Sequence, residues 1–218
     1  MTSVRVLVLF ASIGALSCGG SSPTDETPTC RTYPLSFEEN GTPFTCRLET
    51  GARVTLSCAA GTLNRDWEYA NLADFIGEAA VPNRLRVESR RTTAGALLGS
   101  FTTTIRFYEY DGQQRLTRRV RTSSNSLGTF ELDDARYSQW DAEGRPTRGE
   151  IRAGELSAGV SLSYDDGQRR LEASTGERVV VDRNGNILNE VEVFGLGPDP
   201  FRFERDYVIT ATERACLP

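Results

Sequence analysis

Apolar side chains return at every second position along most of this chain, with arginine, glutamate or threonine between them. The clearest rows are Phe101, Thr103, Ile105 and Phe107; Val160, Leu162 and Tyr164; Val191 and Val193; and Phe201, Phe203, Tyr207 and Ile209. Successive side chains of a strand point to opposite faces, so this alternation predicts antiparallel strands with an apolar face on a core and a polar face in water. Turn signals such as Asp111-Gly112 and Asn184-Gly185 separate the rows. We therefore expect a mainly β fold of about a dozen strands, a single antiparallel meander sheet that is strongly twisted or curled into a half-barrel.

One segment has a different period. Residues 71–83 read NLADFIGEAAVPN, and Asn71 is a good N-cap while Pro82 follows the end of the pattern. The apolar residues at helical spacing are Leu72, Phe75, Ile76 and Ala79. This pattern predicts a helix of about two turns packed on the sheet.

The first residues have the plan of an export signal. The apolar run VLVLFASIGAL at 6–16 has about half of the ~20 residues that a helix needs to span a bilayer. It leads to ALSC at 15–18, which resembles the cleavage box of bacterial lipoproteins. The resemblance implies that Cys18 becomes the first residue and carries a lipid on its sulfur. An ordinary secretory peptide cut near Ser17 is the alternative.

The next segment fits a tether. Residues 19–29 read GGSSPTDETPT and lack side chains large enough to pack, so they could extend to roughly 35 Å. Two lipid chains on Cys18 would give stable anchoring. Gly19 differs from the aspartate that retains lipoproteins in the inner membrane of enteric bacteria, which favours the outer membrane. The predicted organisation is a lipoprotein signal peptide (1–17), a lipidated cysteine with its flexible tether (18–29) and a single antiparallel β domain (30–218).

Four cysteines remain beside Cys18, and an even number in an exported protein implies disulfides. In FTCRLE and VTLSC, Cys46 and Cys58 lie in the apolar rows. The two apolar faces coincide if a hairpin about Gly51 places Cys46 opposite Cys58, whereas a two-residue turn would put them on opposite faces. We predict a Cys46–Cys58 bond and, by exclusion, a Cys30–Cys216 bond that ties the two ends together.

A short pattern of an apolar residue, an aspartate and several turn formers occurs four times. The copies are FYEYDGQQRL, SQWDAEGRPT, SLSYDDGQRRL and VVVDRNGNIL, with Asp111, Asp141, Asp165 and Asp182 as their aspartates. In DRNG and DAEG the aspartate can accept from backbone amides and the glycine tolerates positive φ, which predicts type I turns that close hairpins. DGQQ and DDGQ carry their glycine earlier, so their turns should differ. The large residue before each aspartate should pack at a strand end and fix the register.

These units resemble the YD repeats of bacterial RHS proteins and teneurins. Tyr110-Asp111 with Arg115-Leu116 matches best, and the other copies are degenerate. The resemblance covers about 107–188, under half the chain, at a loose period. It implies a sheet of β-hairpins and does not imply the large enclosing shell of that family, which takes many more repeats.

The residue types exclude much chemistry. The chain has no histidine, and all 25 of its basic residues are arginine. Triads with histidine, histidine-ligated metals and Schiff-base lysines are therefore excluded. DRNGN resembles the start of a calcium loop, but Ile187 stands where the loop needs glycine. We expect no metal and no cofactor.

Carboxylates are the remaining candidates for catalysis. The adjacent pairs are Glu38-Glu39, Asp133-Asp134 and Asp165-Asp166. Neighbours on a strand point to opposite faces, so adjacency makes no catalytic dyad, while a glycosidase needs two carboxyls about 5–9.5 Å apart in a cleft. A carboxylate-dependent hydrolase of envelope polysaccharide is therefore the alternative hypothesis.

The leading hypothesis is a non-catalytic protein of the bacterial cell envelope, lipid-anchored and leaning to the outer membrane. Its sheet would offer a surface for binding or scaffolding, or would cradle an apolar ligand. The expected partners are the membrane, through the lipid on Cys18, and an unknown protein, glycan or apolar ligand. The net charge of −5 and the lack of a long basic stretch argue against nucleic acid.

Overall fold

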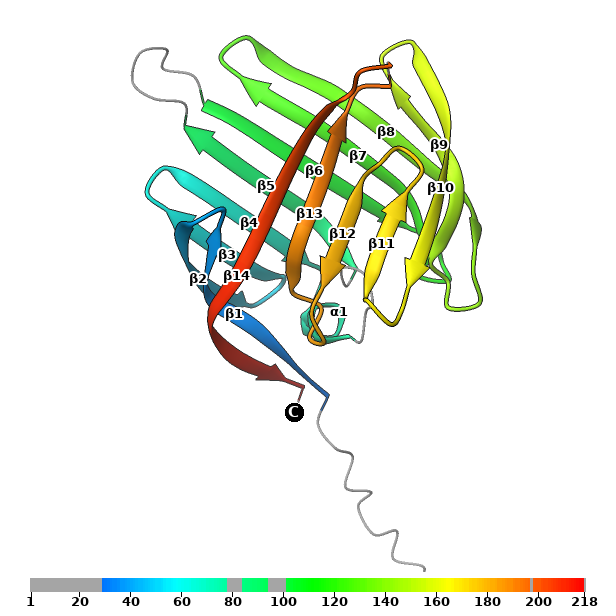
Figure 1. The fold of residues 1–218 in the computed structure, drawn as a ribbon. Helices are drawn as coiled ribbons and strands as arrows, with labels where there is room; N and C mark the ends of the chain where they lie inside the picture. The colour runs from blue at the N-terminus through cyan, green and yellow to red at the C-terminus, as the bar shows by residue number, and fades with distance from the viewer. Residues whose placement is uncertain (1–28, 78–83, 94–100, 197, 218) are drawn as a thin grey trace, which may run out of the picture.

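The computed structural model of the chain describes residues 29–77, 84–93, 101–196 and 198–217. Their strands form one antiparallel meander, and β1 pairs with both β2 and β14, so the sheet closes into a barrel (Figure 1). The strands are β1 (Cys30–Glu39), β2 (Thr42–Thr50), β3 (Val54–Ala60), β4 (Leu63–Tyr69), β5 (Leu85–Thr93), β6 (Phe101–Tyr110), β7 (Leu116–Asn125), β8 (Gly128–Trp140), β9 (Pro146–Ala153), β10 (Leu156–Asp165), β11 (Arg170–Ala173), β12 (Arg178–Val181), β13 (Ile187–Phe194) and β14 (Phe201–Cys216). The mainly β, antiparallel fold predicted from the sequence is confirmed, and the sheet goes beyond a half-barrel to full closure.

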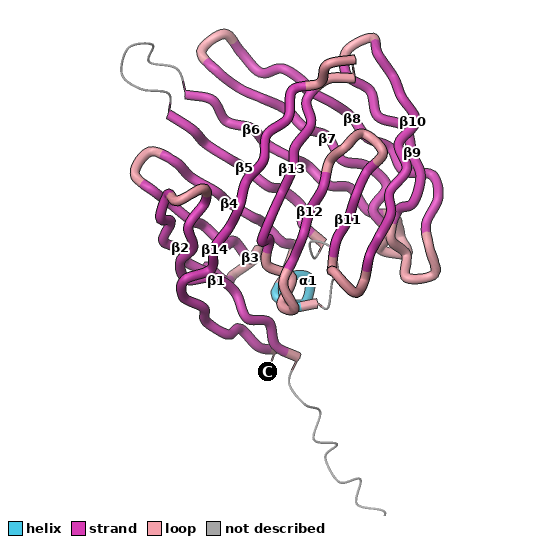
Figure 2. Tube along the Cα trace, in the orientation of Figure 1, coloured by secondary structure: helices cyan, strands magenta, loops and turns pink. Residues whose placement is uncertain are grey.

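The meander gathers every second connection at the same end of the barrel. β1 begins and β14 ends side by side, and we call this end the lower end (Figure 1). Connections that follow even-numbered strands return to it, because neighbouring strands run in opposite directions. The four aspartate turns follow β6, β8, β10 and β12 and therefore lie at the lower end. The short helix α1 (Leu72–Ile76), between β4 and β5, lies there too (Figure 2).

Both predicted disulfides are present. Cys46 pairs with Cys58 across the β2–β3 hairpin, in the register that places Leu48 opposite Leu56. Cys30 is bonded to Cys216 where β1 meets β14. The two cystines thus link β2 to β3 and the first strand to the last.

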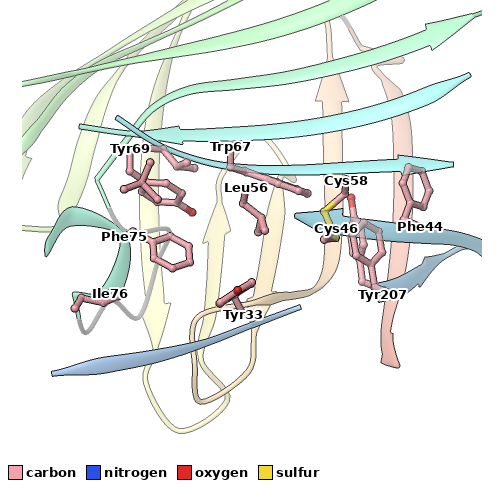
Figure 3. Close-up of a cluster of buried hydrophobic side chains, with 13 residues drawn as sticks. Tyr33, Phe44, Cys46, Leu56, Cys58, Trp67, Tyr69, Phe75, Ile76 and Tyr207 are labelled. Atoms are coloured by element: carbon pink, nitrogen blue, oxygen red, sulfur yellow. A yellow bond between two sulfur atoms is a disulfide. The ribbon is translucent and has the colours of Figure 1, made fainter. Parts of the chain in front are cut away.

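The short helix predicted from its pattern is present, but it is shorter than the expected two turns, because α1 has five residues and Gly77 caps it. The side chain of Asn71 accepts a hydrogen bond from the Asp74 amide at 2.8 Å, which caps α1. Phe75 is fully buried and lies edge-on to Tyr69 and Tyr33, as Figure 3 shows. Ala79 and Pro82, from the same pattern, lie outside the described residues.

An apolar core fills the part of the barrel next to β1–β4 and α1. Its buried members include Phe37, Phe44, Val54, Leu56, Trp67, Ile76, Leu85 and Tyr207 (Figure 3). Aromatic rings dominate it: Phe37 stacks on Phe44 with their ring centroids 5.0 Å apart. Burying such large rings supplies much of the hydrophobic stabilisation of a small domain.

The prediction of which face turns inward is wrong for β6. Phe107, expected in the core, is 42% exposed on the outer face, whereas its neighbour Arg106 is 8% exposed inside the barrel. Tyr108, next on that inner face, hydrogen-bonds Glu88. The reason is electrostatic. Arg106 forms ion pairs with buried carboxylates of other strands, Glu88 and Glu190, so the charged row of β6 faces inward.

Other rows give a mixed outcome. Val160 on β10 is buried as expected. Val191 and Val193 on β13 are buried, but so are Glu190 and Glu192 on the opposite face. On β14 the expected apolar row divides: its lower member Tyr207 is buried, and its upper members are exposed, namely Phe201 and Phe203.

Gly149 on β9 marks a close approach of two strands. A Cβ added there would overlap the carbonyl of Arg136 and the Cα of Tyr137, on the paired strand β8. Gly149→Ala should therefore lower the free energy of unfolding by about 1–3 kcal/mol, as overpacking does, in urea titrations of the oxidised protein. Gly159→Ala on β10 is the matched control, because no atom of the described residues lies within 4 Å of its added Cβ. Equal losses for the two variants would contradict the close approach.

Candidate functional site

The barrel encloses a cavity of about 210 Å³ between β5 and β13. One side of it is apolar and comes mainly from β8 to β12. The apolar lining includes Ala135, Ile151, Val160, Leu162, Leu171 and Ala173. The opposite side is charged and comes from β5–β7, β13 and the segment before β12. The charged lining includes Glu88, Arg106, Arg119, Glu177, Glu190 and Glu192.

The cavity extends to the lower end of the barrel. Gln114, Gly144 and Pro146, which belong to the lower turns or follow them directly, line it, and Gln114 is exposed. Tyr110 and Tyr164 stand beside them and donate hydrogen bonds to the carbonyls of Leu85 and Pro146, at 3.2 and 2.8 Å. Burial raises the pKa of both phenols, so they remain neutral donors at pH 7. The lower opening is thus framed by neutral tyrosines and turn residues.

Two arginines and three glutamates form the centre of the charged side. Arg106 on β6 reaches Glu88 at 2.6 Å and Glu190 at 2.9 Å, and it also contacts Glu192. Arg90 on β5 reaches the same three carboxylates at 2.7, 2.5 and 3.0 Å. Each glutamate therefore bridges two guanidinium groups. Strands far apart in sequence are joined here across the interior of the barrel.

Two further pairs continue this cluster on β7. Arg121, 1% exposed, binds Asp133 and donates to the carbonyl of Val193 at 2.7 Å. Arg119 binds Glu177 more loosely, with nitrogen–oxygen distances of 3.3 and 3.4 Å. One nitrogen of Arg121, Nη1, has no hydrogen-bond partner among the described residues and lies 3.6 Å from Glu177.

Positive and negative charges balance within this assembly, which we call the ion network. Its members are Arg65, Arg90, Arg106, Arg119, Arg121 and Arg205, with Glu39, Glu88, Asp133, Glu177, Glu190 and Glu192. Buried charges are tolerated when they are paired and hydrogen-bonded. The ion network is therefore highly polar but carries no net charge.

The pairing sets the protonation states. Burial raises the pKa of Glu88 most strongly, but the attraction of Arg106 and Arg90 outweighs it and lowers that pKa to about 2. The same competition, won by Arg106, Arg90 and Arg205, lowers the pKa of Glu192. These carboxylates are ionised at neutral pH.

Stability should consequently fall in acid. Glu88 has a folded pKa of about 2 against an ordinary value of 4.5, so its contribution is complete above about pH 4.5 and is lost as the pH falls towards 2. Urea titrations from pH 7 to pH 2 should show the free energy of unfolding decreasing mainly in that window. The fall should be smaller in Glu88→Gln, which has no carboxyl to protonate. A flat profile in the wild-type protein would contradict the lowered pKa.

The aspartate turns at the lower end share a hydrogen-bond plan. In three of them one carboxylate oxygen accepts from the backbone amide four residues on, at 2.8–2.9 Å: Arg115 to Asp111, Arg145 to Asp141 and Asn186 to Asp182. The expected match of DAEG and DRNG is confirmed, since Gly144 and Gly185 have positive φ. The expected difference for DGQQ is wrong, because Gln114 adopts φ 63° at the same place. The turn of Asp165 does differ, and its positive φ falls one residue later, at Arg169.

Arginines of these turns stack on the aromatic residue of the next turn. The guanidinium of Arg115 lies 4.3 Å from the ring centroid of Trp140, and that of Arg145 lies 4.4 Å from Tyr164. Each arginine is also held by the aspartate of its own turn. Cation–π contacts of this kind are worth about 0.5–2 kcal/mol. Successive turns are thus tied into a rim around the lower opening.

The structure divides the candidates from the sequence. Cys18 lies outside the described residues. The four cystine residues lie away from the cavity's charged side, and Asp111, Asp141, Asp165 and Asp182 are turn residues. Of the adjacent carboxylate pairs, Asp133 joins the ion network and Asp134 binds Arg118 on the outer side. Neighbours therefore do point to opposite faces, as expected.

Sequence reasoning missed the ion network. Glu88 and Arg90, like Glu190 and Glu192, are spaced two apart and so share a face. That spacing could have predicted that the charged side chains form rows on one face of each strand. The spacing does not show that these rows face inward, because two of the three partners of Arg90, Glu190 and Glu192, are about a hundred residues away.

No family model matches the chain, and neither the curated proteins nor the solved structures give a significant match. Among the described residues there is no helix long and apolar enough to cross a membrane. The same residues contain no group of three or more His, Cys, Asp or Glu that could hold a metal ion.

Proposed function

We propose that the protein is a non-catalytic binding protein of the bacterial envelope whose barrel holds a small, partly apolar molecule. The cavity carries this proposal. It combines an apolar wall with a few polar groups at fixed positions, which is the usual composition of a small-molecule site. Its volume of about 210 Å³ corresponds to roughly seven molecules of liquid water, which indicates a small ligand.

Lipid anchoring on Cys18 belongs to the same proposal. The described chain begins at the lower end, so a tether through residues 19–29 would leave from there. The cavity reaches that end too. A barrel anchored in this way would present its opening towards the membrane.

The anchor has a direct test. Mass spectrometry of the mature protein should find Cys18 at its N-terminus with a lipid on its sulfur, and Cys18→Ser should release the protein from membranes. A mature chain that starts elsewhere, or a serine variant that still partitions with membranes, would remove the anchor from the account.

The alternative of a hydrolase has one feature in its favour, because several buried carboxylates line one cavity wall. Their chemistry favours binding instead. A general acid needs a pKa raised towards neutrality, whereas arginines lower the pKa of Glu88 and Glu192. Hydrolysis of peptidoglycan or a related glycan that is abolished in Glu88→Gln would overturn the non-catalytic proposal.

Filling the cavity tests the binding proposal. Ala173 lines the cavity on β11, and Ala173→Phe would occupy much of its volume. Isothermal titration with octan-1-ol should show one site in the wild-type protein and at least a tenfold weaker one in Ala173→Phe. Ser163→Phe is the matched control, because it adds the same ring at an exposed position of β10. No octan-1-ol binding in the wild-type protein, or an equal loss in both variants, would contradict a ligand inside the barrel.

A further inference from the structure

We propose that the ligand is an anionic single-chain amphiphile, a monocarboxylate like a medium-chain fatty acid, with its head on Arg119 and its chain along the apolar wall. The inference rests on the proposed function and names the class of molecule that the cavity takes. Three observations carry it: the loose pairing of Arg119, the unpartnered nitrogen of Arg121 and the apolar wall opposite both.

On the charged side, Arg119 is held only by long contacts, so a ligand carboxylate could replace its present partner. Its distances to Glu177 are 3.3 and 3.4 Å and to Asp133 3.4 Å, and its own Nε is buried and finds no hydrogen-bond partner in the described part of the chain. The neighbouring pairs made by Arg106 are much shorter, at 2.6 and 2.9 Å. Good charge-assisted bonds measure about 2.7–2.9 Å. Arg119 therefore has donors that a better acceptor can use.

Glu177 has a second possible partner, Arg121, to which it can shift when a ligand binds. Nη1 of Arg121 is buried, has no hydrogen-bond partner among the residues that the structure describes, and lies 3.6 Å from Oε1 of Glu177. A shift of less than about 1 Å would bring these atoms to normal hydrogen-bond distance. Glu177 would then satisfy Arg121 and release Arg119. Arg119 is not left unpaired by this exchange, because the incoming carboxylate replaces the one that moves.

Unused donors at this spot also favour an anion. Nε of Arg119 and Nη1 of Arg121 have no hydrogen-bond partner among the described residues. The two arginines share Asp133, a loosely held Glu177 and Glu192, which lies 3.7 Å from Nη1 of Arg121. One incoming carboxylate supplies the missing acceptor, whereas a dianion would be repelled by Glu88, Glu190 and Glu192 on the same wall.

The planar guanidinium selects a carboxylate, and the opposite wall selects a hydrocarbon chain. Arginine binds carboxylates through two parallel N–H bonds. Ala135 pairs with Arg119 across β7 and β8, and Ile151 pairs with Ala135, so apolar side chains start level with the head. Leu162 and Leu171 continue that wall towards the lower end.

The cavity volume sets the chain length. About 210 Å³ holds roughly seven heavy atoms at the ~30 Å³ that one water occupies in the liquid. Pentanoate has about seven heavy atoms, so affinity should rise about fourfold for each CH₂ from propanoate to pentanoate and more slowly from there to octanoate, where the chain enters the lower opening.

Opposite charge variants test the head site. Isothermal titration of octanoate, octan-1-ol and octylamine against the full chain should rank octanoate first. Arg119→Gln should weaken octanoate about 10- to 100-fold, and Glu177→Gln should strengthen it about tenfold, because the competing carboxylate is gone. The affinity for octan-1-ol should change less than about threefold in either variant. A general structural disturbance would instead weaken both ligands. The double variant Arg119→Gln/Glu177→Gln keeps the charge balance and should bind octanoate no better than octan-1-ol.

Three results would overturn the inference. They are octylamine binding more tightly than octanoate, Arg119→Gln leaving octanoate unchanged, and Glu177→Gln weakening it. If octan-1-ol binds but octanoate binds no better, the ligand class is wrong and the proposed function stands. If octan-1-ol, octanoate and octylamine all fail to bind the wild-type protein, the proposed function falls as well.

Discussion

Glu192→Gln should lower the free energy of unfolding by about 3–5 kcal/mol, the usual cost of removing one partner from a buried ion pair. Glu192 is buried and contacts Arg90, Arg106 and Arg205 at once. Glutamine nearly keeps the shape of glutamate but removes the charge, so three largely buried arginines lose a charged acceptor. The change should appear in urea titrations as a lower midpoint with an unchanged slope.

A matched control separates this effect from the chemistry of the substitution. Glu204 on β14 pairs with Arg178 at 2.8 Å but is largely exposed. Exposed pairs contribute little, so Glu204→Gln should leave the midpoint almost unchanged. A loss below about 1 kcal/mol for Glu192→Gln would mean that the ion network is solvated and does not support the barrel.

Coupling provides a second check on the network. Arg205 reaches Glu192 from β14. If the two groups act together, the double variant Arg205→Gln/Glu192→Gln should be more stable than the sum of the single losses predicts, by at least about 1 kcal/mol. Strict additivity would place the two residues in separate environments.

The second large effect concerns the disulfide that joins the chain ends. Cys30 and Cys216 are 186 residues apart, whereas Cys46 and Cys58 are 12 apart. In the chain-entropy model a cross-link constrains the unfolded chain more when its loop is longer, which gives about 5 kcal/mol for the first bond and about 3 kcal/mol for the second. The Cys30→Ser/Cys216→Ser variant should therefore be the less stable of the two double-serine variants.

The comparison is made by urea titration of the two double-serine variants beside the wild-type protein. The Cys30–Cys216 bond also sits on the pair of strands that closes the barrel, β1 and β14. Its removal should add fraying of that pair, visible as faster amide exchange along β14. A variant lacking Cys30–Cys216 that is as stable as one lacking Cys46–Cys58 would contradict the loop-length argument.

Local patterns in the sequence were sufficient for local structure. The alternation around Cys46 and Cys58 fixes their register, because a slip by one residue would move both apolar rows to the wrong faces. Asn71 predicts the start of α1 because its capping hydrogen bond involves only residues close in sequence. The turn of Asp111 shows the limit of such rules. Gln114 adopts a positive φ there, at the position where two of the other turns have glycine.

The candidate site could not be predicted in the same way. Alternation on β6 separates Arg106 from Phe107 correctly, but it does not say which of the two faces inward. That choice depends on Glu190 and Glu192, which reach Arg106 because the sheet closes. Closure is a property of the whole meander, and the cavity and the ion network both follow from it.

Whether the barrel carries a molecule inside is the most direct question for this account. Native mass spectrometry of the full chain, purified gently from cells and then offered octanoate, answers it in a single measurement. The account predicts a one-to-one complex with a small carboxylic acid in the wild-type protein and in Ser163→Phe, and its loss in Ala173→Phe. A wild-type protein that is empty as purified and stays empty in octanoate would contradict it.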